Sequence, residues 1–469
     1  MLTASVDIVI RATGGELLAG SLSKVVSDVC IDSRCIRPGC TFVALPGEHT
    51  DGHDFVLAAI DAGAKLIIVS RTAEQVAELV DAAKRRDVAV VRVDDALRAI
   101  QDLATYHRSR LYCEVLGITG STGKTSTKDF VMAALSAGKR AVGTQGNRNN
   151  ELGVPLTVLA ANADTEVLVV EMGMRGIGQI ASLCAIARPT LGLLTNVGTS
   201  HIELLGSQDA VAQAKGELVR CLPASGVAFL NGDDDYSVRI ASTTAAAITL
   251  YGLSEGCAVR AADIELDAES RATFTLVSSA GSASVKLPVP GRHNVYNALA
   301  AAAVALQLGI APAAIAEELA RADMSAMRMQ VINTASGLTL INDAYNANPA
   351  SMRAAVDTLA AMATGNRRIA VLGDMAELGS FTELAHFRIG ETLARLGIDE
   401  LVTVGARAHR IAEGALAAGM SAQHVRVTED AESAAETLGE LAEAGDVVLV
   451  KASRVMGLEV VVDRMVALR

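Results

Sequence analysis

The chain has 469 residues, a formal net charge of −12 and an isoelectric point near 5.2. At about 150 residues per domain, this length predicts three domains. Hydrophobic residues make up 51% of the chain and aromatic residues 3%, with no tryptophan, so the cores must be aliphatic. The acidic balance excludes a general nucleic-acid binder, which needs a basic face, and we expect no nucleic-acid partner.

The cysteines and the apolar runs predict a cytoplasmic protein without membrane insertion. Seven cysteines, odd in number and scattered, are typical of reduced thiols rather than of a disulfide scaffold. Cys30, Cys35 and Cys40 do not have the Cys-x-x-Cys spacing of a zinc site. We expect no signal peptide, because acidic residues and an arginine interrupt the N-terminal apolar run. The longest apolar run, residues 298–306, is too short to span a membrane.

Strand-like and helix-like runs alternate almost throughout, which favours an α/β fold with parallel sheets. The first segment has predicted strands at residues 41–45, 65–69 and 88–93, and predicted helices at 55–62 and 73–84. Near Cys113 the pattern restarts with a short apolar strand, residues 115–119, that runs into a glycine-rich loop. This restart marks the first domain boundary.

The later segments continue the α/β pattern with one interruption. The second segment has predicted strands at residues 166–171, 191–196 and 227–231, helices at 208–219, 294–308 and 312–320, and a hairpin-type insertion from 272–277 and 284–289. The third segment opens near Met324, with strands at 338–343, 368–372, 400–404 and 446–451. We therefore predict an N-terminal domain at 1–112, a central parallel-sheet domain at 113–322, and a C-terminal Rossmann-like domain at 323–469.

The strongest local signal is the glycine-rich loop at residues 117–126, with the sequence Gly-Ile-Thr-Gly-Ser-Thr-Gly-Lys-Thr-Ser. Backbone N–H groups of such a loop converge on phosphate oxygens, while Lys124 reaches the β- and γ-phosphates and the Thr125 hydroxyl can ligate Mg²⁺. The strict phosphate-loop pattern fails by one place, because position 118 is isoleucine. The alternative is a turn without a ligand, and the loop alone indicates only an NTPase, kinase or ligase.

Three further residues carry groups that could serve a functional site. Glu171 ends an apolar strand, at the sheet edge where ligands collect, and could hold a metal; it could also be a solvated acid. His201 follows the next strand and is either a ligand or a structural histidine. Lys215 lies on an amphipathic helix, where the pattern alone favours a solvated lysine.

Three polar segments complete the candidate site. His293 and Asn294 precede an alanine-rich helix, where an asparagine either caps the helix or contacts a purine, and the spacing leaves both open. The run at 343–349 is dense enough in polar groups to predict a binding loop rather than an ordinary turn. Lys451 and Arg454 follow an apolar strand and offer two cations to an anionic group.

Together these segments resemble the Mur ligase family of ATP-dependent amide-forming enzymes. The resemblance covers nearly the whole chain and rests on residues 32–34, 42–45, 51–55, 117–126, 146–156, 171–174, 195–203, 214–217, 293–300, 343–349, 372–379 and 451–454. The chain departs from the family pattern at Gln179, Ala452 and Leu458, where glutamate, glycine and methionine are usual. Segments 147–156 and 343–349 are similar to those of the member that adds D-alanyl-D-alanine to a UDP-linked muramoyl tripeptide.

The resemblance implies an ATP-dependent ligase that works through an acyl phosphate in peptidoglycan precursor synthesis. It implies catalytic roles for Lys124, Lys215, His201 and Glu171. It also implies two Mg²⁺ ions held by Thr125, Glu171, His201 and a carbamylated Lys215. We expect a monomer acting on small-molecule substrates. The competing interpretations are another amino-acid ligase of the family, a catalytically silent ATP-binding subunit, and a simple kinase or ATPase.

The resemblance also assigns binding residues to each domain. For ATP these are the loop residues Gly120, Ser121, Thr122, Gly123, Lys124, Thr125 and Ser126, with His293 and Asn294 for adenine and Arg328 and Asp343 for ribose and phosphates. For the UDP-linked substrate they are Ser33, Arg34, Asn147, Asn149 and Asn150. For the dipeptide they are Tyr345, Asn346 and Asn348.

Overall fold

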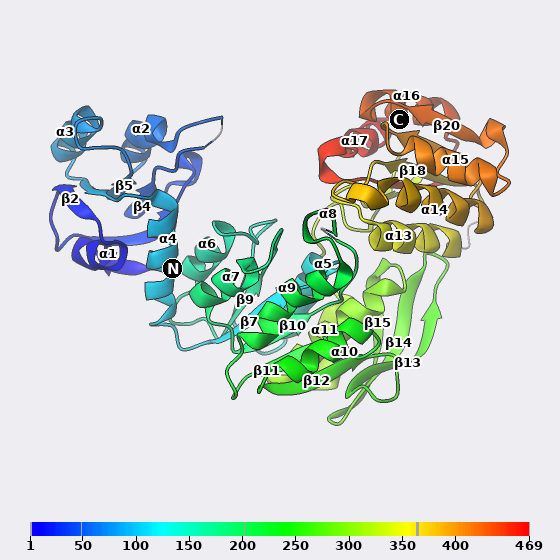
Figure 1. Ribbon diagram of the computed structural model, residues 1–469, viewed down its shortest axis with the longest axis horizontal. Coiled ribbons are helices and arrows are strands. Elements are labelled where there is room, and N and C mark those ends of the chain that lie inside the picture. The colour runs from blue at the N-terminus through cyan, green and yellow to red at the C-terminus, as the bar shows by residue number, and fades with distance from the viewer. Residues whose placement is uncertain (1, 48, 201, 363–364, 469) are drawn as a thin grey trace. The chain divides into compact units, whose positions relative to one another are not determined.

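The computed structural model describes residues 2–47, 49–200, 202–362 and 365–468 (Figure 1). The chain divides into two compact units, each described by itself. Unit 1 comprises Met1–Gly117, Lys139–Gly173 and Ile180–Leu191, and unit 2 comprises Ile118–Gly138, Met174–Gln179 and Gly192–Arg469. The division crosses strand β7 (Glu114–Thr119), which leads into the glycine-rich loop.

Unit 1 contains a six-stranded sheet in the order β1-β3-β4-β5-β6-β2. Its strands are β1 (Thr3–Ser5), β2 (Glu16–Ala19), β3 (Val25–Cys30), β4 (Cys40–Val43), β5 (Leu66–Val69) and β6 (Ala89–Arg92). Strands β3 to β6 are parallel, as predicted, whereas β1 and β2 pair antiparallel to β3 and β6. The prediction of parallel sheets is wrong for these two edge strands. A short edge strand pairs with one neighbour only and lacks the apolar run by which the sequence indicates a strand.

Burial on both faces explains why the predicted strands of this sheet were recognisable. Strands β4 and β5 are buried at every position. Helices α1 (Val6–Thr13), α2 (Val56–Asp61), α3 (Ala77–Arg85) and α4 (Ala96–Arg108) accompany the sheet. The buried Arg108 ends α4 and donates to the carbonyl oxygens of Ala187, Leu111 and Arg188 at 2.8, 3.0 and 3.2 Å, which fixes the chain where it leaves the helix.

The rest of unit 1 carries the predicted strand that ends in Glu171. Strands β8 (Ala141–Gly143) and β9 (Val167–Glu171) are parallel neighbours. The associated helices are α6 (Gly153–Ala160) and α7 (Gln179–Ala187). Helix α6 packs against α4, so the N-terminal sheet and this part of the chain form one compact body.

Unit 2 begins at the glycine-rich loop and contains strands in the order β15-β14-β13-β12-β11-β10. They are β10 (Leu191–Leu194), β11 (Val227–Asn231), β12 (Ala247–Gly252), β13 (Val259–Leu266), β14 (Arg271–Ser278) and β15 (Gly281–Pro290). The predicted hairpin is confirmed, since β14 and β15 pair antiparallel. The helices are α5 (Lys124–Ser136), α8 (Ile202–Leu205), α9 (Gln208–Arg220), α10 (Asp235–Ile240), α11 (His293–Gln307) and α12 (Pro312–Ala320).

The C-terminal part of unit 2 is a Rossmann-like sheet in the order β16-β17-β21-β18-β19-β20. The strands are β16 (Gln330–Asn333), β17 (Thr339–Asn342), β18 (Arg368–Gly373), β19 (Glu400–Val404), β20 (Val425–Thr428) and β21 (Val447–Lys451). All pairs are parallel except β16 with β17. The exposed edge strands β16 and β20 were not predicted, because their polar residues hide the apolar run that identifies a central strand.

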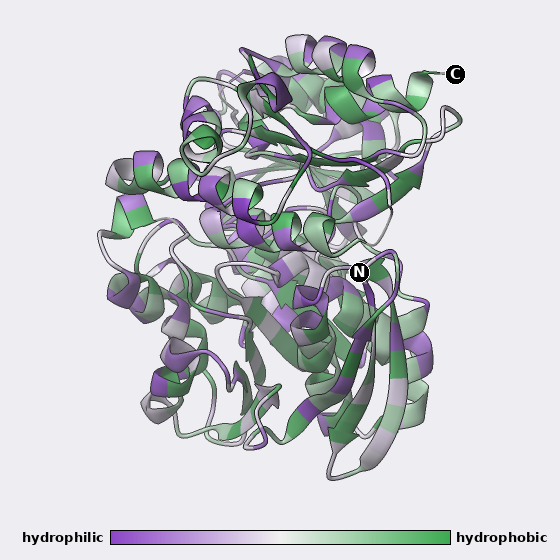
Figure 2. Ribbon diagram, turned by 90° about the vertical axis from the view of Figure 1, so that its right-hand side faces the viewer, coloured by the Kyte–Doolittle hydropathy of each residue, from purple (hydrophilic) through white to green (hydrophobic). Residues whose placement is uncertain are grey.

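Two apolar layers cover this sheet. Helices α13 (Pro349–Ala361), α14 (Thr382–Arg395) and α15 (His409–Ala417) share one core cluster, and α16 (Ala431–Leu441) and α17 (Glu459–Ala467) share the other. Figure 2 shows hydrophobic strands inside helices with more hydrophilic outer faces. The alternation along β18 explains both layers: Ile369 and Val371 face one cluster, and Ala370 and Leu372 face the other. None of the helices in the described residues is long and apolar enough to cross a membrane.

A buried histidine of the C-terminal sheet makes stability depend on pH. The Nδ1 atom of His386 donates to the Thr382 carbonyl at 2.7 Å, and its Nε2 atom accepts from the Met375 N–H at 2.9 Å, which requires the neutral ring. Burial lowers the pKa of His386. Below the ordinary pKa of about 6.5, the unfolded chain therefore binds a proton that the folded chain resists. We expect the free energy of unfolding to fall as the pH drops below this value.

Urea unfolding at several pH values, compared with His386→Gln, measures this contribution. The variant cannot titrate at this position, so its stability should fall less steeply, by up to about 1.4 kcal/mol per pH unit. Equal slopes for the two proteins would mean that His386 is not the responsible group.

Candidate active site

The glycine-rich loop connects β7 to α5, as predicted. Gly120 and Gly123 have φ angles of +153° and +78°, which side chains rarely adopt, so both turns require glycine. Gly123 occupies the N-cap position and has no side chain to bond the N–H groups of the first helical turn. A helix that begins in this way presents N–H groups and the positive end of its dipole to an anion.

Two lysine side chains meet at one backbone oxygen of this loop. Lys124 donates to the Gly120 carbonyl at 2.8 Å, and Lys215 donates to the same carbonyl at 2.9 Å. Burial, together with the positive charge of Lys124, lowers the pKa of the Lys215 amine well below its ordinary value. The arrangement places the Lys124 ammonium and a buried amine of lowered pKa at the loop where the sequence predicts phosphate.

The pattern of helix α9 explains why Lys215 is buried. Lys215 is 2% exposed, so the interpretation as a solvated lysine is wrong. It shares one helix face, at the i, i+3, i+4, i+7 spacing, with three buried apolar residues: Val211, Ala214 and Leu218. The hydrophobic face therefore carries the amine inward to Gly120.

The segment after β10 holds the phosphate loop by hydrogen bonds. The Ser121 N–H donates to the Asn196 carbonyl at 3.0 Å, and the Thr195 hydroxyl donates to the Thr122 carbonyl at 2.6 Å. The Ser200 hydroxyl donates to the Ser121 carbonyl at 3.0 Å. His201, the predicted metal ligand that follows, lies outside the described residues.

Helix α11 reaches the loop through Asn297. Its amide oxygen accepts from the Thr127 hydroxyl at 3.1 Å and lies 2.6 Å from the position that a Cβ atom on Gly123 would take. Its amide nitrogen donates to Asn294 Oδ1 at 2.9 Å, and Asn294 donates to the Pro290 carbonyl at 2.8 Å. The buried Asn294 amide thus links Pro290 to Asn297 and does not cap α11. A contact with a purine stays a prediction.

Unit 1 brings two predicted site residues together. The Asn149 amide donates to Glu171 Oε1 at 2.8 Å, and the Glu171 N–H donates to the Thr144 hydroxyl at 2.9 Å. Glu171 is buried at the end of β9. Asn150 accepts from the Gly153 N–H at 3.0 Å at the start of α6, and Asn147 is exposed. Asn149 therefore orients the carboxylate, while Asn150 makes a helix-start contact.

The N-terminal candidates lie in an exposed turn. Ser33 begins a short 3-10 helix, and Asp32 caps it by accepting from the Arg34 N–H at 3.0 Å. The Arg34 guanidinium also pairs with Asp32 at 2.7 Å and lowers the pKa of this carboxyl to about 2. Arg34 thus presents an exposed guanidinium whose position is fixed by a neighbouring carboxylate.

Lys451 is not available as a cation for an anionic ligand. It is buried and donates to Asp343 Oδ2 at 2.6 Å and to the Asn346 carbonyl at 2.8 Å. Arg454 pairs with Glu459 at 2.8 Å. The prediction of two cations offered to one anion is therefore wrong for Lys451, whose charge holds the loop after β17 in place.

Predicted ATP-contacting residues from two distant segments meet in unit 2. His293 starts α11, and burial lowers its pKa, with the charge of Asp343 acting to raise it and that of Lys451 acting to lower it. Arg328 lies over the Tyr345 ring at 4.2 Å from its centroid. His293, Asp343, Arg328 and Tyr345 thus converge on the loop after β17.

The two asparagines of this loop also shape it. Asn348 accepts from the Ser351 N–H at 2.9 Å as the N-cap of α13, in a capping box. Its amide nitrogen lies 3.5 Å from the Ser200 hydroxyl. The Asn346 side chain accepts from the Ala347 N–H at 2.9 Å. The loop therefore combines ordinary turn chemistry with the predicted binding groups.

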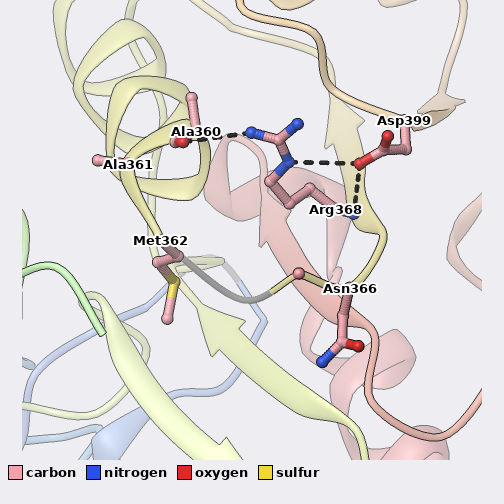
Figure 3. Close-up of a pocket in the computed structure, with 7 residues that line it drawn as sticks. Ala360, Ala361, Met362, Asn366, Arg368 and Asp399 are labelled. Carbon is pink, nitrogen blue, oxygen red and sulfur yellow. Dashed lines mark hydrogen bonds and ion pairs between the residues drawn. The ribbon is translucent and has the colours of Figure 1, made fainter. Parts of the chain in front are cut away.

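A pocket of about 470 Å³ lies at the opposite end of the C-terminal sheet, at the amino ends of its strands (Figure 3). Arg368 is the cationic residue that lines this pocket. Its guanidinium donates to Asp399 at 3.3 Å and to the carbonyl oxygens of Ala360 and Gly397. The arginine is thus engaged in holding strand and helix ends, and the candidate active site lies elsewhere.

Sequence reasoning assigned no role to Asn196, Asn297 or the Lys451–Asp343 pair. Asn196 lies beside the predicted His201, and Asn297 repeats Asn294 at a three-residue spacing on one helix face. Those spacings were the sequence signals that could have indicated a role for Asn196 and Asn297. No local signal existed for the pairing of Lys451 with Asp343, because 108 residues separate them.

Comparison with known proteins identifies the domains in this order. Three family models match the chain. They are described as "Mur ligase family, catalytic domain" for residues 25–107, "Mur ligase middle domain" for 118–305 and "Mur ligase, glutamate ligase domain" for 327–454. The chain is 41% identical to the UDP-N-acetylmuramoyl-tripeptide–D-alanyl-D-alanine ligase of Mycobacterium bovis, over 95% of this chain and 93% of the relative.

Two solved structures are also similar over almost the whole chain. A crystal structure of MurF from Acinetobacter baumannii has a TM-score of 0.86 at 31% identity and covers 99% of both chains. MurF ligase from Thermotoga maritima, solved in complex with ADP, has a TM-score of 0.79 at 27% identity and covers 94% of this chain and 97% of its own.

Alanine at Gly123 should disrupt the loop. The added Cβ would contact Asn297 Oδ1 and force a side chain into a left-handed conformation. We expect ADP binding to weaken by about 10-fold or more, measured by isothermal titration calorimetry. Gly309→Ala is the matched control, because its φ is +81° but no atom lies within 4 Å of the added Cβ. Equal losses in both variants would assign the effect to backbone strain alone.

Proposed function

This chain belongs to the Mur ligase family, and on that premise we propose that it joins D-alanyl-D-alanine to UDP-N-acetylmuramoyl-tripeptide with ATP as the energy source. The observation that carries the proposal is the meeting of Lys124 and Lys215 at the Gly120 carbonyl. ADP in the Thermotoga maritima relative supports the use of ATP. The activity belongs to the synthesis of peptidoglycan precursors.

The proposed reaction has two steps that each bring anions together. The peptide carboxylate attacks the γ-phosphate to give an acyl phosphate and ADP; the amino group of the dipeptide then attacks the acyl carbon and phosphate leaves. Charge neutralisation is therefore the main demand on the protein. Lys124 and the N–H groups of the loop stabilise the phosphoryl charge.

The donor set suits magnesium. The described residues contain no group of three or more histidines, cysteines or acids that could hold a metal ion. Thr125 and Glu171 are both buried and offer oxygen donors, which Mg²⁺ prefers together with water and substrate phosphates. Thr125 and Glu171 are the proposed ligands of a first Mg²⁺, and His201 of a second. Such ions would neutralise phosphate charge.

Lys215 is proposed to be carbamylated. The reaction with CO₂ needs a neutral amine, and burial beside Lys124 lowers the pKa of Lys215 in the required direction. The amine nitrogen bonds to the carbon of CO₂ and releases one proton to water. The carbamate anion would attract the Lys124 ammonium and supply an oxygen ligand for the metal.

The remaining assignments divide the substrates among the three proposed domains. Residues 1–112 would bind the UDP end, with Ser33 and Arg34, and Asn147, Asn149 and Asn150 would face the sugar-peptide. The central domain, 113–322, would hold ATP, with His293 and Asn294 towards adenine. The C-terminal domain, 323–469, would bring Arg328 and Asp343 to ATP and Tyr345, Asn346 and Asn348 to the dipeptide. Closure would exclude water from the acyl phosphate.

Phosphate release in a leave-one-out design tests the function. The complete mixture holds ATP, Mg²⁺, UDP-N-acetylmuramoyl-tripeptide and D-alanyl-D-alanine, and each is omitted in turn. Turnover should require all four, with one product of the summed mass less water. Turnover with a single amino acid in place of the dipeptide would indicate a sister ligase, and ATP binding without turnover would indicate a silent subunit.

Carbamylation is tested by carbon-13 NMR. With labelled bicarbonate, the wild-type protein should show a carbamate resonance that Lys215→Arg lacks, because the arginine remains protonated. Turnover in the variant should fall by about 100-fold or more, while ADP affinity stays within about 3-fold. A resonance that persists in the variant would place the modification on another amine.

A further inference from the structure

We propose that Asp129 is a positioning residue that anchors the joint between the central and C-terminal domains to the helix of the phosphate loop, and so sets the place of Arg328. The role of Arg328 rests on the proposed function, whereas the anchor rests on contacts within unit 2. The joint is the segment at residues 323–329, which connects the central fold to β16.

The anchor begins on helix α5, five residues after Lys124. Asp129 is 8% exposed, and its Oδ2 atom accepts from the Ser325 N–H at 2.9 Å. Its Oδ1 atom pairs with the Lys128 ammonium at 3.0 Å, and both side chains are almost fully buried. Burying such a pair costs desolvation that surface residues avoid, so its contribution lies in fixing a geometry.

A second carboxylate holds the other end of the joint. Asp343 accepts from the Met329 N–H at 3.1 Å, while Lys451 holds Asp343 itself. The Tyr345 N–H donates to the Met327 carbonyl at 3.3 Å. The joint is therefore fastened to the central domain at Ser325 and to the C-terminal domain at Met329.

The backbone between the two anchors is constrained. Met327 and Met329 have φ angles of +59° and +51°, a left-handed conformation that is uncommon for side chains other than glycine. Arg328 lies between them, with its guanidinium over the Tyr345 ring. Because both neighbours are held, the backbone of Arg328 stays in place as long as the anchors hold.

This arrangement makes the helix that starts at the phosphate loop and the joint that carries Arg328 one connected element. ATP bound at Lys124 contacts the first turn of α5, and Asp129 occupies the second turn of the same helix. Asp129 touches no reacting group in this scheme. It determines where the C-terminal domain, through Arg328, meets the nucleotide.

The test compares two double variants that differ only in the hydrogen-bond acceptor. Lys128→Met/Asp129→Asn removes both charges but retains an amide oxygen for the Ser325 N–H. Lys128→Met/Asp129→Leu removes the charges and the acceptor. Removing both charges together avoids an unpaired buried ion. Glu317→Gln, which breaks an exposed ion pair with Arg321 shortly before the joint, serves as a surface control.

Hydrogen–deuterium exchange of the backbone amides measures how firmly the joint is held, and it does not depend on ligase activity. In the leucine variant, exchange at 323–329 should rise by about 10-fold relative to the asparagine variant, while exchange over residues 124–136 stays unchanged. Ligase kcat should fall by about 10-fold, and ADP affinity should stay within about 3-fold. The control variant should match the wild type in all three measurements.

Two outcomes would overturn the inference. Unchanged exchange at 323–329 in the leucine variant would show that Asp129 does not hold the joint. An equal rise across α5 would show that the pair only stabilises the helix. If the wild-type protein has no ligase turnover, the proposed function fails, but the exchange comparison still decides the anchor.

Discussion

Two ammonium groups on one carbonyl oxygen are the constraint around which the candidate site is organised. Like charges at such a distance repel each other, and one of them, on Lys215, is removed from water. The arrangement is stable when an amine loses its proton or when an anion joins the pair. The lowered pKa of Lys215 supplies the first solution, and the proposed phosphate ligand would supply the second. A site built in this way is prepared for negative charge before any ligand arrives.

The elements around the loop meet this constraint from different directions. Helix α9 delivers Lys215 on its apolar face, the segment after β10 bonds the backbone of the loop, and α11 places Asn297 where Gly123 leaves space. Each contact joins residues far apart in the chain, so none is a local feature of the loop. The geometry therefore depends on the completed fold of unit 2.

The sequence predicted the features that depend on adjacent residues and missed those that depend on contacts between distant residues. The β7–loop–α5 unit was predicted, because its strand, glycines and helix start are adjacent residues. Strands that are buried at every position, such as β4, β5 and β19, were predicted. The less buried strands were not; these are β1, β2, β3, β8, β12, β13, β16 and β20. The helix pattern alone did not predict the burial of Lys215, because its partner Gly120 lies 95 residues away; only the family resemblance implied it. Lys451 was wrongly predicted to bind an anionic ligand for the same reason, because its partner Asp343 lies 108 residues away. A lysine at the end of a strand gives the same sequence pattern whether it contacts a phosphate or a carboxylate.

The stacking of Arg328 on Tyr345 has a spectroscopic consequence. The chain contains no tryptophan and only six tyrosines, so an indole introduced at Tyr345 would be its single long-wavelength fluorophore. A cation over that ring would perturb its emission, and the signal would report the separation of guanidinium and ring in solution. Because the chain has no tryptophan, the fluorescence of the introduced indole could be measured without emission from any other indole.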